Sequence, residues 1–329
     1  NLIIKIQCIH LKIFLKEELK EPCSFWIMKT IKTIDLFAGI GGMRIGVDLA
    51  AKSLKIKHKN VFSSEIDKYC CQIYELNFGE KPFGDITKPK NSEIDKIIPN
   101  HDLLLAGFPC QPFSQAGLKK GFEDTRGTLF YDILRILKKK KPKAFLLENV
   151  SNLKGHDNGR TLKIILENLN KIGYSVPYPQ ILSSKDFGLP QNRRRIFIVG
   201  FLKKLRCEFE WPSPINKNTK VGDILEPKSK VPKKYFISNK LWAGHKRRKK
   251  QNKLDGKGFG FGLVNSKSQY TNTISARYYK DGSEILIQQG GGNPRKLMPV
   301  EAKRLQGFPK TYNISAISDV HYINIWEIV

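Results

Sequence analysis

The sequence predicts an α/β fold in which a large domain with a mostly parallel sheet precedes a smaller, irregular domain. Strand-like segments alternate with helical segments between residues 31 and 201, which is the pattern of βαβ units. A glycine-rich turn, Phe37-Ala38-Gly39-Ile40-Gly41-Gly42, joins the first strand to the first helix. After about Pro212 the periodicity fades, and Pro, Lys, Asn and Gly dominate. That change in composition and hydrophobic periodicity predicts a second domain.

The chain has 329 residues and a strong excess of basic side chains, with 58 Lys and Arg against 30 Asp and Glu, a net charge of +28 and a pI near 9.8. This charge favours a polyanionic partner, with nucleic acid ahead of a membrane surface. The alternative is lysine inflated on solvated faces by an AT-rich genome. No apolar stretch reaches the roughly 18 residues that cross a bilayer, so no membrane partner is expected.

The six cysteines form no Cys-x-x-Cys pair and no ligand-like grouping with the six histidines. We therefore expect no metal site and no disulfide framework. A reduced, cytoplasmic compartment fits this pattern.

The first methionine is Met28, directly before the first strand. We interpret residues 1–27 as a leader that is not native, with Met28 as the natural start. The apolar opening is interrupted by Lys5, His10 and Lys12, so we reject a signal peptide.

The first half of the large domain predicts a nucleoside pocket. Ile31 to Phe37 is a strand by its β-branched content, the helix opens near Met43, and the next strand, Asn60 to Ser64, ends at Glu65. An acidic residue at that place suits ribose hydroxyls, and Asp85 suits an adenine amino group. For either acid alone, an ordinary helix cap is the competing interpretation.

The stretch Gly107 to Ser114 follows the apolar run Leu103 to Ala106 and contains Cys110 between a proline and a glutamine. We interpret Cys110 as a nucleophile at the carboxyl end of a strand, where open α/β sheets place their chemistry. Simple core packing of a free cysteine is the alternative. The polar stretch Ser114 to Gly127 is long enough for a mobile lid.

The second half of the large domain adds charged side chains at a strand end. A helix from Thr128 to Lys139 leads into the strand Ala144 to Leu147, which is followed by Glu148. A helix near 160–171 and strands near 175–183 and 196–201 complete the domain. Arg193 and Arg195 alternate on extended chain and project to the same side, either to bind an anion or as a basic surface edge.

Residues 213–294 are expected to form a recognition domain. The basic run His245 to Lys250 is followed by Gly256 to Gly262 and by a segment, Tyr270 to Gln288, in which aromatic, arginine and amide side chains interleave. This mixture suits contacts to base edges and to a nucleic-acid backbone.

The motifs in this order resemble those of the DNA cytosine-5 methyltransferases of bacterial restriction–modification systems. They are Asp35 to Gly42, Glu65, Gly84 to Ile86, Gly107 to Ser114, Glu148-Asn149-Val150, Gln191 to Arg195, and Arg295 to Pro309. The resemblance covers about residues 28–320 and implies a Rossmann-like S-adenosylmethionine-dependent catalytic domain, 28–212, and a target-recognition domain, 213–294.

The resemblance also implies the chemistry. Cys110 is the implied nucleophile that adds to cytosine C6, Glu148 acts at N3, and Arg195 with Arg193 steadies the base, the thiolate or Glu148. Because neither cytosine atom is reachable in a duplex, the base must flip out.

The implied cofactor is S-adenosyl-L-methionine, and its expected contacts share the strand ends and turns of the nucleoside pocket. They are Phe37, Gly39, Gly41, Gly42, Glu65, Ile66, Asp85, Ile86 and Pro109. Ile66 departs from the family, which often has tryptophan against the adenine ring. We expect a modest loss of cofactor affinity from this difference.

Expected DNA contacts are Gln111, Ser114, Arg247, Arg248, Arg277, Tyr278 and Lys280. The recognition segment is similar to the target regions of Dcm-type and EcoRII-type enzymes, which implies a CCNGG or CCWGG-like site. Double-stranded DNA and a cognate restriction endonuclease are the implied partners, and we expect a monomer.

The carboxyl end departs from the family. Ser318-Asp319-Val320 begins the expected closing segment, but His321 to Val329 does not continue it. Codons that allow these nine residues, read one base early, encode Leu-Tyr-Lys-His-Leu-Gly-Asn-Ser. We therefore interpret 295–329 as a hinge and motif segment whose end is truncated or frameshifted. The gene sequence tests this interpretation.

Two other functions stay open. Because the expected closing segment does not continue after Val320, one alternative is a DNA-binding remnant with impaired catalysis. The other is a tRNA-directed cytosine-5 methyltransferase, which would share the catalytic motifs. The long basic recognition domain counts against the second.

Overall fold

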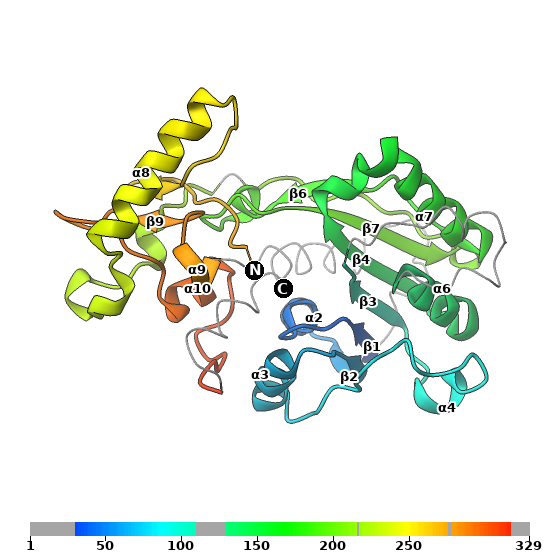
Figure 1. Ribbon diagram of the computed structural model, residues 1–329. Coiled ribbons are helices and arrows are strands. Elements are labelled where there is room, and N and C mark those ends of the chain that lie inside the picture. Colours follow the sequence, from blue (N-terminus) through cyan, green and yellow to red (C-terminus); the bar gives the residue numbers. More distant parts are fainter. Residues whose placement is uncertain (1–29, 110–128, 216, 276–277, 317–329) are drawn as a thin grey trace. The chain divides into compact units, whose positions relative to one another are not determined.

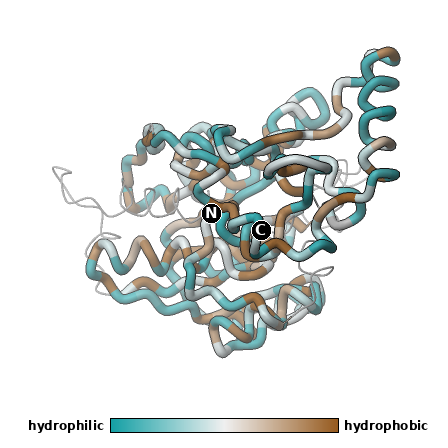
Figure 2. Tube along the Cα trace, turned by 90° about the vertical axis from the view of Figure 1, so that its left-hand side faces the viewer, coloured by the Kyte–Doolittle hydropathy of each residue, from teal (hydrophilic) through white to brown (hydrophobic). Residues whose placement is uncertain are grey.

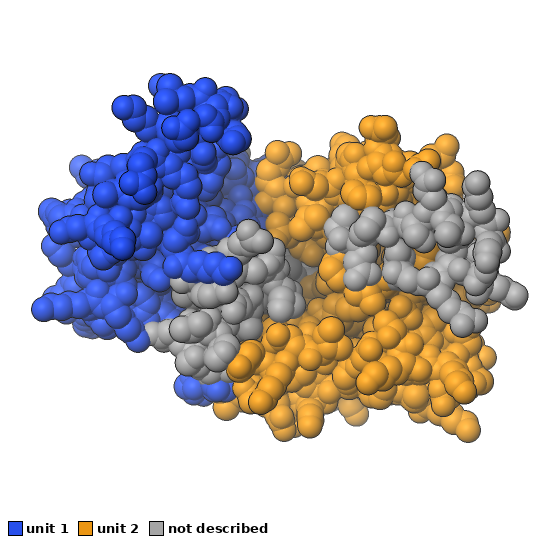
Figure 3. Space-filling view, in the orientation of Figure 1, with its two compact units in different colours: residues 1–2, 183–193, 214–329 blue, residues 3–182, 194–213 orange. Residues whose placement is uncertain are grey.

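The computed structural model describes residues 30–109, 129–215, 217–275 and 278–316. In these ranges the chain divides into two compact units, a larger one of residues up to 182 with 194–213, and a smaller one of 183–193 with 214–316 (Figure 3). This partition differs from the expected one in placing 183–193 and the described part of 295–329 in the smaller unit. The expected leader, 1–27, and the divergent carboxyl end lie outside the described residues.

The larger unit is built on a seven-stranded sheet with the order β2-β1-β3-β4-β7-β5, and β6 pairs with β7. The strands are β1 (Thr30–Leu36), β2 (Lys57–Ser64), β3 (Leu103–Gly107), β4 (Ala144–Val150), β5 (Tyr174–Ser175), β6 (Gln180–Ser183) and β7 (Arg194–Leu202). β1 pairs in parallel with β2 and β3, and β3 with β4, whereas β7 runs antiparallel to β4. The carboxyl ends of the four parallel strands therefore meet at one edge of the sheet.

Helices cover both faces of this sheet. They are α2 (Gly42–Ser53), α3 (Lys68–Phe78), α4 (Ile94–Ile97), α6 (Leu129–Lys140) and α7 (Arg160–Lys171), with 3-10 turns η1 (Ser151–Lys154), η2 (His156–Gly159) and η4 (Lys203–Leu205). α4, α6 and α7 share one apolar core with the strands, which includes Leu104, Phe145 and Ile165. In Figure 1, α2 lies on the opposite side of the sheet from α6 and α7.

The expected Rossmann-like α/β architecture is confirmed, and two strands differ from expectation. β4 continues through Glu148 to Val150, because β7 pairs with it as far as Val150 and Arg195. The expected strand 175–183 is interrupted between β5 and β6. Helix α3 was not predicted; Asp67 caps it by accepting from the N–H groups of Tyr69 and Cys70.

The smaller unit has short, irregular elements. They are η3 (Ser184–Phe187), η5 (Val221–Ile224), η6 (Lys228–Lys230), η7 (Lys233–Tyr235), α8 (Asn239–Leu254), β8 (Leu263–Val264), α9 (Tyr278–Asp281), β9 (Leu286–Ile287) and α10 (Pro299–Leu305). Its buried apolar residues include Tyr278, Leu286, Ile287 and Leu297.

Among the described residues, no helix combines the length and apolar content needed to cross a bilayer. In the same ranges no group of three or more His, Cys, Asp and Glu side chains is arranged to hold a metal ion. Cys70 and Cys71 are free thiols, whereas Cys207 is disulfide-bonded. That bond differs from the expectation of a fully reduced chain.

Candidate active site

The site is organised by the strand register at the carboxyl edge of the sheet. Gly107, the last residue of β3, lies opposite Glu148 of β4. A Cβ placed at Gly107 would lie 3.7 Å from Oε2 of Glu148, so the carboxyl group leans toward the end of β3. Glu148 therefore stands beside the point where the chain leaves β3 for Cys110.

Glu148 and Arg195 form an ion pair across the β4–β7 ladder. The Arg195 Nε lies 2.9 Å from Oε1 of Glu148, and their side chains are 11% and 10% exposed. Nη1 of Arg195 also donates to the carbonyl of Arg194. The pairing keeps a carboxylate at a site that is nearly closed to water, where an unpaired charge would be costly.

Asn149 fixes the loop that carries the expected nucleophile, and sequence reasoning gave it no role. Its Nδ2 donates to the carbonyl of Phe108 at 2.8 Å, and its Oδ1 accepts from the N–H of Val150 at 2.8 Å. The side chain is 2% exposed. Asn149 thus ties the end of β4 to the segment two residues before Cys110.

Cys110, Gln111, Ser114 and Arg277 lie outside the described residues, as does the expected lid. Arg193 is described: it belongs to the smaller unit, is 1% exposed, and donates its backbone N–H to Oγ of Ser184. Among the four expected catalytic residues, the structure brings Glu148 and Arg195 together.

Glu65 organises the glycine-rich turn. Its Oε2 accepts from the N–H of Gly39 at 2.7 Å, and its Oε1 accepts from the N–H groups of Ile66 and Asp67, each at 2.8 Å. Burial raises the pKa of Glu65, and these backbone N–H groups act against that rise. Oε2 accepts from one N–H, which leaves it an acceptor position for a ligand hydroxyl.

The glycines of the turn serve different purposes. Gly39 and Gly41 have φ values of 54° and 79°, and Phe37 also lies in the left-handed region at 55°. A Cβ at Gly41 would lie 2.3 Å from the Phe78 ring. Gly41 is therefore required by packing against α3 as well as by its backbone conformation. Gly42 begins α2.

The expected adenine end of the pocket shows one exposed apolar side chain and one capped acid. Ile66 is 76% exposed, whereas the side chain of Ile86 is 2% exposed and belongs to the core. Asp85 accepts from the N–H and hydroxyl of Thr87, both at Oδ1, and these bonds lower its pKa. Pro109 is exposed. Because the Ile86 side chain is buried, any contact of Ile86 with a cofactor would have to use its backbone.

Asp35, on β1, was part of the matched motif but received no role. It is fully buried, and neither carboxylate oxygen has a hydrogen-bond partner among the described residues. Burial raises its pKa well above the ordinary value, the charge of Arg44 lowers it, and the nearby Glu65 raises it. Strand periodicity alone does not reveal such a group.

The expected DNA contacts differ in exposure. Arg247 and Lys280 are exposed, whereas Tyr278 is fully buried, donates its hydroxyl to the carbonyl of Ile285 and accepts from the N–H of Leu297. The burial counts against the expected DNA contact at Tyr278, because core packing and two hydrogen bonds occupy the side chain. Arg248 pairs with Asp281 at 3.0 Å.

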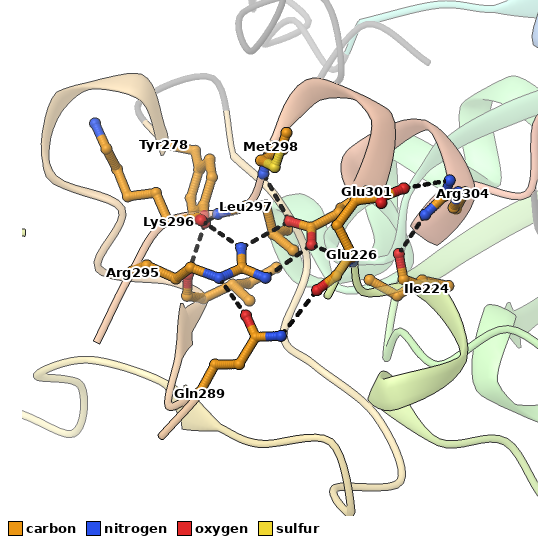
Figure 4. A network of polar contacts seen from close by, with 11 residues as sticks. Ile224, Glu226, Tyr278, Gln289, Arg295, Lys296, Leu297, Met298, Glu301 and Arg304 are labelled. Carbon is orange, nitrogen blue, oxygen red and sulfur yellow. Dashed lines mark hydrogen bonds and ion pairs between the residues drawn. The ribbon is translucent and has the colours of Figure 1, made fainter. Parts of the chain in front are cut away.

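The Arg295 motif forms a buried network within the smaller unit (Figure 4). Arg295 and Glu301 are both fully buried and form a bidentate pair at 2.8 and 2.7 Å. Gln289 accepts from Arg295, and the N–H of Glu226 donates to Glu301. The expected hinge is therefore, in its described part, integral to the core of the smaller unit.

Comparisons with known proteins agree with this arrangement. The family model of C-5 cytosine-specific DNA methylases matches residues 31–325. The chain is 60% identical to the Type II methyltransferase M.NlaX of Neisseria lactamica over 284 residues, which are 86% of this chain and 87% of the relative. It is 58% identical to the Type II methyltransferase M1.ScrFI of Lactococcus lactis subsp. cremoris over 291 residues, 88% of this chain and 72% of the relative.

A solved structure shares the fold. The Dnmt2 methyltransferase of S. pombe superposes with a TM-score of 0.70 at 20% identity, covering 91% of this chain and 94% of that one. At this identity the likeness shows the fold alone, whereas the family model and the closely similar relatives show the activity class. The chain belongs to the C-5 cytosine-specific DNA methylases and is a DNA (cytosine-5-)-methyltransferase of the restriction–modification type.

Proposed function

We propose that this chain transfers a methyl group from S-adenosyl-L-methionine to cytosine C5 in a double-stranded CCNGG or CCWGG-like site. The observation that carries the catalytic part is the placement of the Glu148–Arg195 pair beside Gly107, three residues before Cys110. The likeness of the recognition segment to Dcm-type and EcoRII-type target regions supports the site.

The residues present fit the cofactor. Glu65 has an acceptor position for ribose hydroxyls, exposed Ile66 offers an apolar surface to a ring, and Asp85 keeps Oδ2 for an amino group. The buried Asp35, which lacks a hydrogen-bond partner among the described residues, fits a cationic ligand group near the turn. The cofactor supplies the methyl group as an electrophile.

The chain's own residues prepare the cytosine. In the proposed reaction the Cys110 thiolate forms a bond to C6 of a flipped base, and Glu148 holds or donates a proton at N3 as negative charge develops there. C5 thereby gains the electron density to accept the methyl group. Transfer of the C5 proton to water then lets its bonding pair re-form the C5–C6 double bond. The bond between Cys110 and C6 breaks, Cys110 leaves as a thiolate, and the methylated base is released. Arg195 holds Glu148 in position, and Asn149 holds the loop.

The decisive test is transfer of tritium from labelled cofactor to duplexes with CCWGG, CCNGG and scrambled sites, with transfer RNA as a further substrate. We expect incorporation into the first two duplexes and none with Cys110→Ser. Binding without transfer would favour the impaired remnant, and incorporation into RNA would favour the tRNA enzyme. Bisulfite sequencing of DNA from an expressing host, with methylation confined to unrelated sites, would refute the target.

The same proposal includes a cognate restriction endonuclease as functional partner, a monomeric state and a cytoplasmic location. Gel filtration with light scattering tests the monomer.

A further inference from the structure

Helix α8 of the smaller unit is basic throughout. Its sequence, NKLWAGHKRRKKQNKL, contains no Asp or Glu, and Figure 2 shows it as hydrophilic along most of its length. Like charges that lie three and four residues apart, such as Arg247 and Lys250, repel one another. No acid within the helix offsets this repulsion, so the charge is matched only by groups outside it.

One face of α8 is used for packing. The Trp242 and Phe261 rings meet edge to face with centroids 4.9 Å apart. His245 is 1% exposed, and its Nε2 hydrogen-bonds to the carbonyl of Asp281. Arg248 pairs with the carboxylate of Asp281 at 3.0 Å and also contacts His245. These contacts fix the rotation of the helix about its axis.

The opposite face carries exposed cations. At about 100° per residue, Lys240, Arg247 and Lys250 fall on the side away from His245. Lys253 lies at the border of that side, and all four cations are exposed. Lys246 and Lys249 border this stripe, with their Nζ atoms 5.5 Å and 4.4 Å from the centroids of the Trp242 and Phe261 rings. We define Lys240, Arg247, Lys250 and Lys253 as the outer stripe.

We propose that the outer stripe binds phosphates of duplex DNA and does not read bases. Arg247 to Lys253 span about 9 Å of helix. Two to three successive phosphates of one strand occupy a similar length of the duplex axis, at about 3.4 Å of axis per phosphate. Lysine ends on flexible stems act as point charges, whereas base readout requires held, bidentate groups. Arg248, expected from the sequence to contact DNA, is instead a positioning residue for α8.

DNA is the favoured polyanion over an anionic lipid surface. Membrane-surface helices combine a basic face with an apolar face that enters the lipid. On α8, Leu241 and Trp242 lie on the packed side, and the outer side offers only Ala243 and, at the carboxyl end, Leu254, which is 73% exposed. The family acts on DNA, and the inference requires only a duplex, whatever its target sequence.

The test is fluorescence anisotropy of the full chain with a CCWGG duplex and a scrambled duplex over a series of KCl concentrations. In R247Q/K250Q/K253Q we expect the slope of log Kd against log salt to fall by about 2 to 3, at about 0.9 per lost phosphate contact. Kd should rise at least about tenfold at low salt for both duplexes. The ratio of the two affinities should stay unchanged.

Matched variants separate the alternatives. K52Q/K57Q/K59Q removes the same charge from exposed lysines of the larger unit and should keep the wild-type slope, and K250R/K253R should do so as well. Circular dichroism checks that α8 still forms. A slope equal to wild type in R247Q/K250Q/K253Q overturns the proposal, as does a loss confined to the CCWGG duplex, which would indicate base readout. Binding to phosphatidylserine vesicles that the triple variant loses while its DNA binding stays intact also overturns it.

Discussion

The Nε of Arg195 lies 2.9 Å from Oε1 of Glu148, and both side chains are almost closed to solvent. The two residues are brought together by antiparallel pairing of β4 and β7, in which Glu148 faces Phe197 and Val150 faces Arg195. A buried ion pair of this kind is more sensitive to loss of one partner than to loss of both.

Arg195→Ala should therefore destabilise the chain by about 3–5 kcal/mol and abolish most methyl transfer. Glu148→Gln should cost less stability, because a neutral amide remains, but should lower turnover by about 10²–10⁴-fold. Urea unfolding and tritium transfer measure the two effects. If the double variant that combines Arg195→Ala with Glu148→Gln loses as much stability as the two single variants added together, the two residues are not coupled.

Asn149→Ala should lower turnover while DNA binding is kept, because it frees the Phe108 carbonyl from the end of β4. The buried carbonyl loses its partner, at a cost of about 1–3 kcal/mol. Transfer assays beside anisotropy measure the separation. Asn168→Ala is a matched control, since among the described residues the Asn168 side-chain amide donates only to the carbonyl of Ile164 in its own helix. Equal losses in both variants would contradict a specific role for Asn149.

Asp35→Asn should change the pH dependence of stability. Burial raises the pKa of Asp35 in the folded chain, so the folded state binds more protons than the unfolded state above about pH 4. Stability is thus present at low pH and falls as pH rises from the unfolded pKa through the folded one. In the absence of cofactor, Asp35→Asn should not show this loss of stability with rising pH, and its Tm at neutral pH should be higher than that of the wild type. A pH profile of Tm equal to that of the wild type would contradict this prediction.

Ile66→Trp should tighten cofactor binding, and Ile66→Ala should weaken it, because 76% of the Ile66 side chain is exposed and free to cover a ring. Isothermal titration with S-adenosyl-L-methionine measures both. Leu76→Ala, at a residue 44% exposed on α3, is the control and should leave Kd unchanged. If all three variants bind S-adenosyl-L-methionine with the same Kd, Ile66 does not line the cofactor pocket.

Arg295→Ala should unfold the smaller unit by leaving Glu301 buried without its partner, at about 3–5 kcal/mol. Replacing both residues by apolar ones, as in R295M/E301L, should recover most of that stability. Limited proteolysis, with cleavage sites mapped by mass spectrometry, reports on this unit separately from the larger one. A double variant no more stable than Arg295→Ala would show that the hydrogen bonds to Gln289 and Glu226 dominate.

The sequence by itself determined the α/β class, most strand positions and three helices of the larger unit, and the choice of Glu148 and Arg195 as candidate catalytic residues. It could do so because strand content, a glycine-rich turn and the order of motifs are local properties of the chain. It did not reveal the roles of Asn149 and Asp35, or the burial of Tyr278, because these depend on which residues face them across the fold.

The tertiary structure decided what each polar group touches. Arg248 and Arg247 are neighbours in one basic run and both are exposed, yet helix geometry turns Arg248 toward Asp281 and points Arg247 away from it. The described part of the expected hinge became core, because Arg295 finds Glu301 six residues later only when α10 folds beside Gln289 and Glu226. Composition gives the charge of such residues, whereas only packing determines which charges are paired inside and which remain available to a ligand.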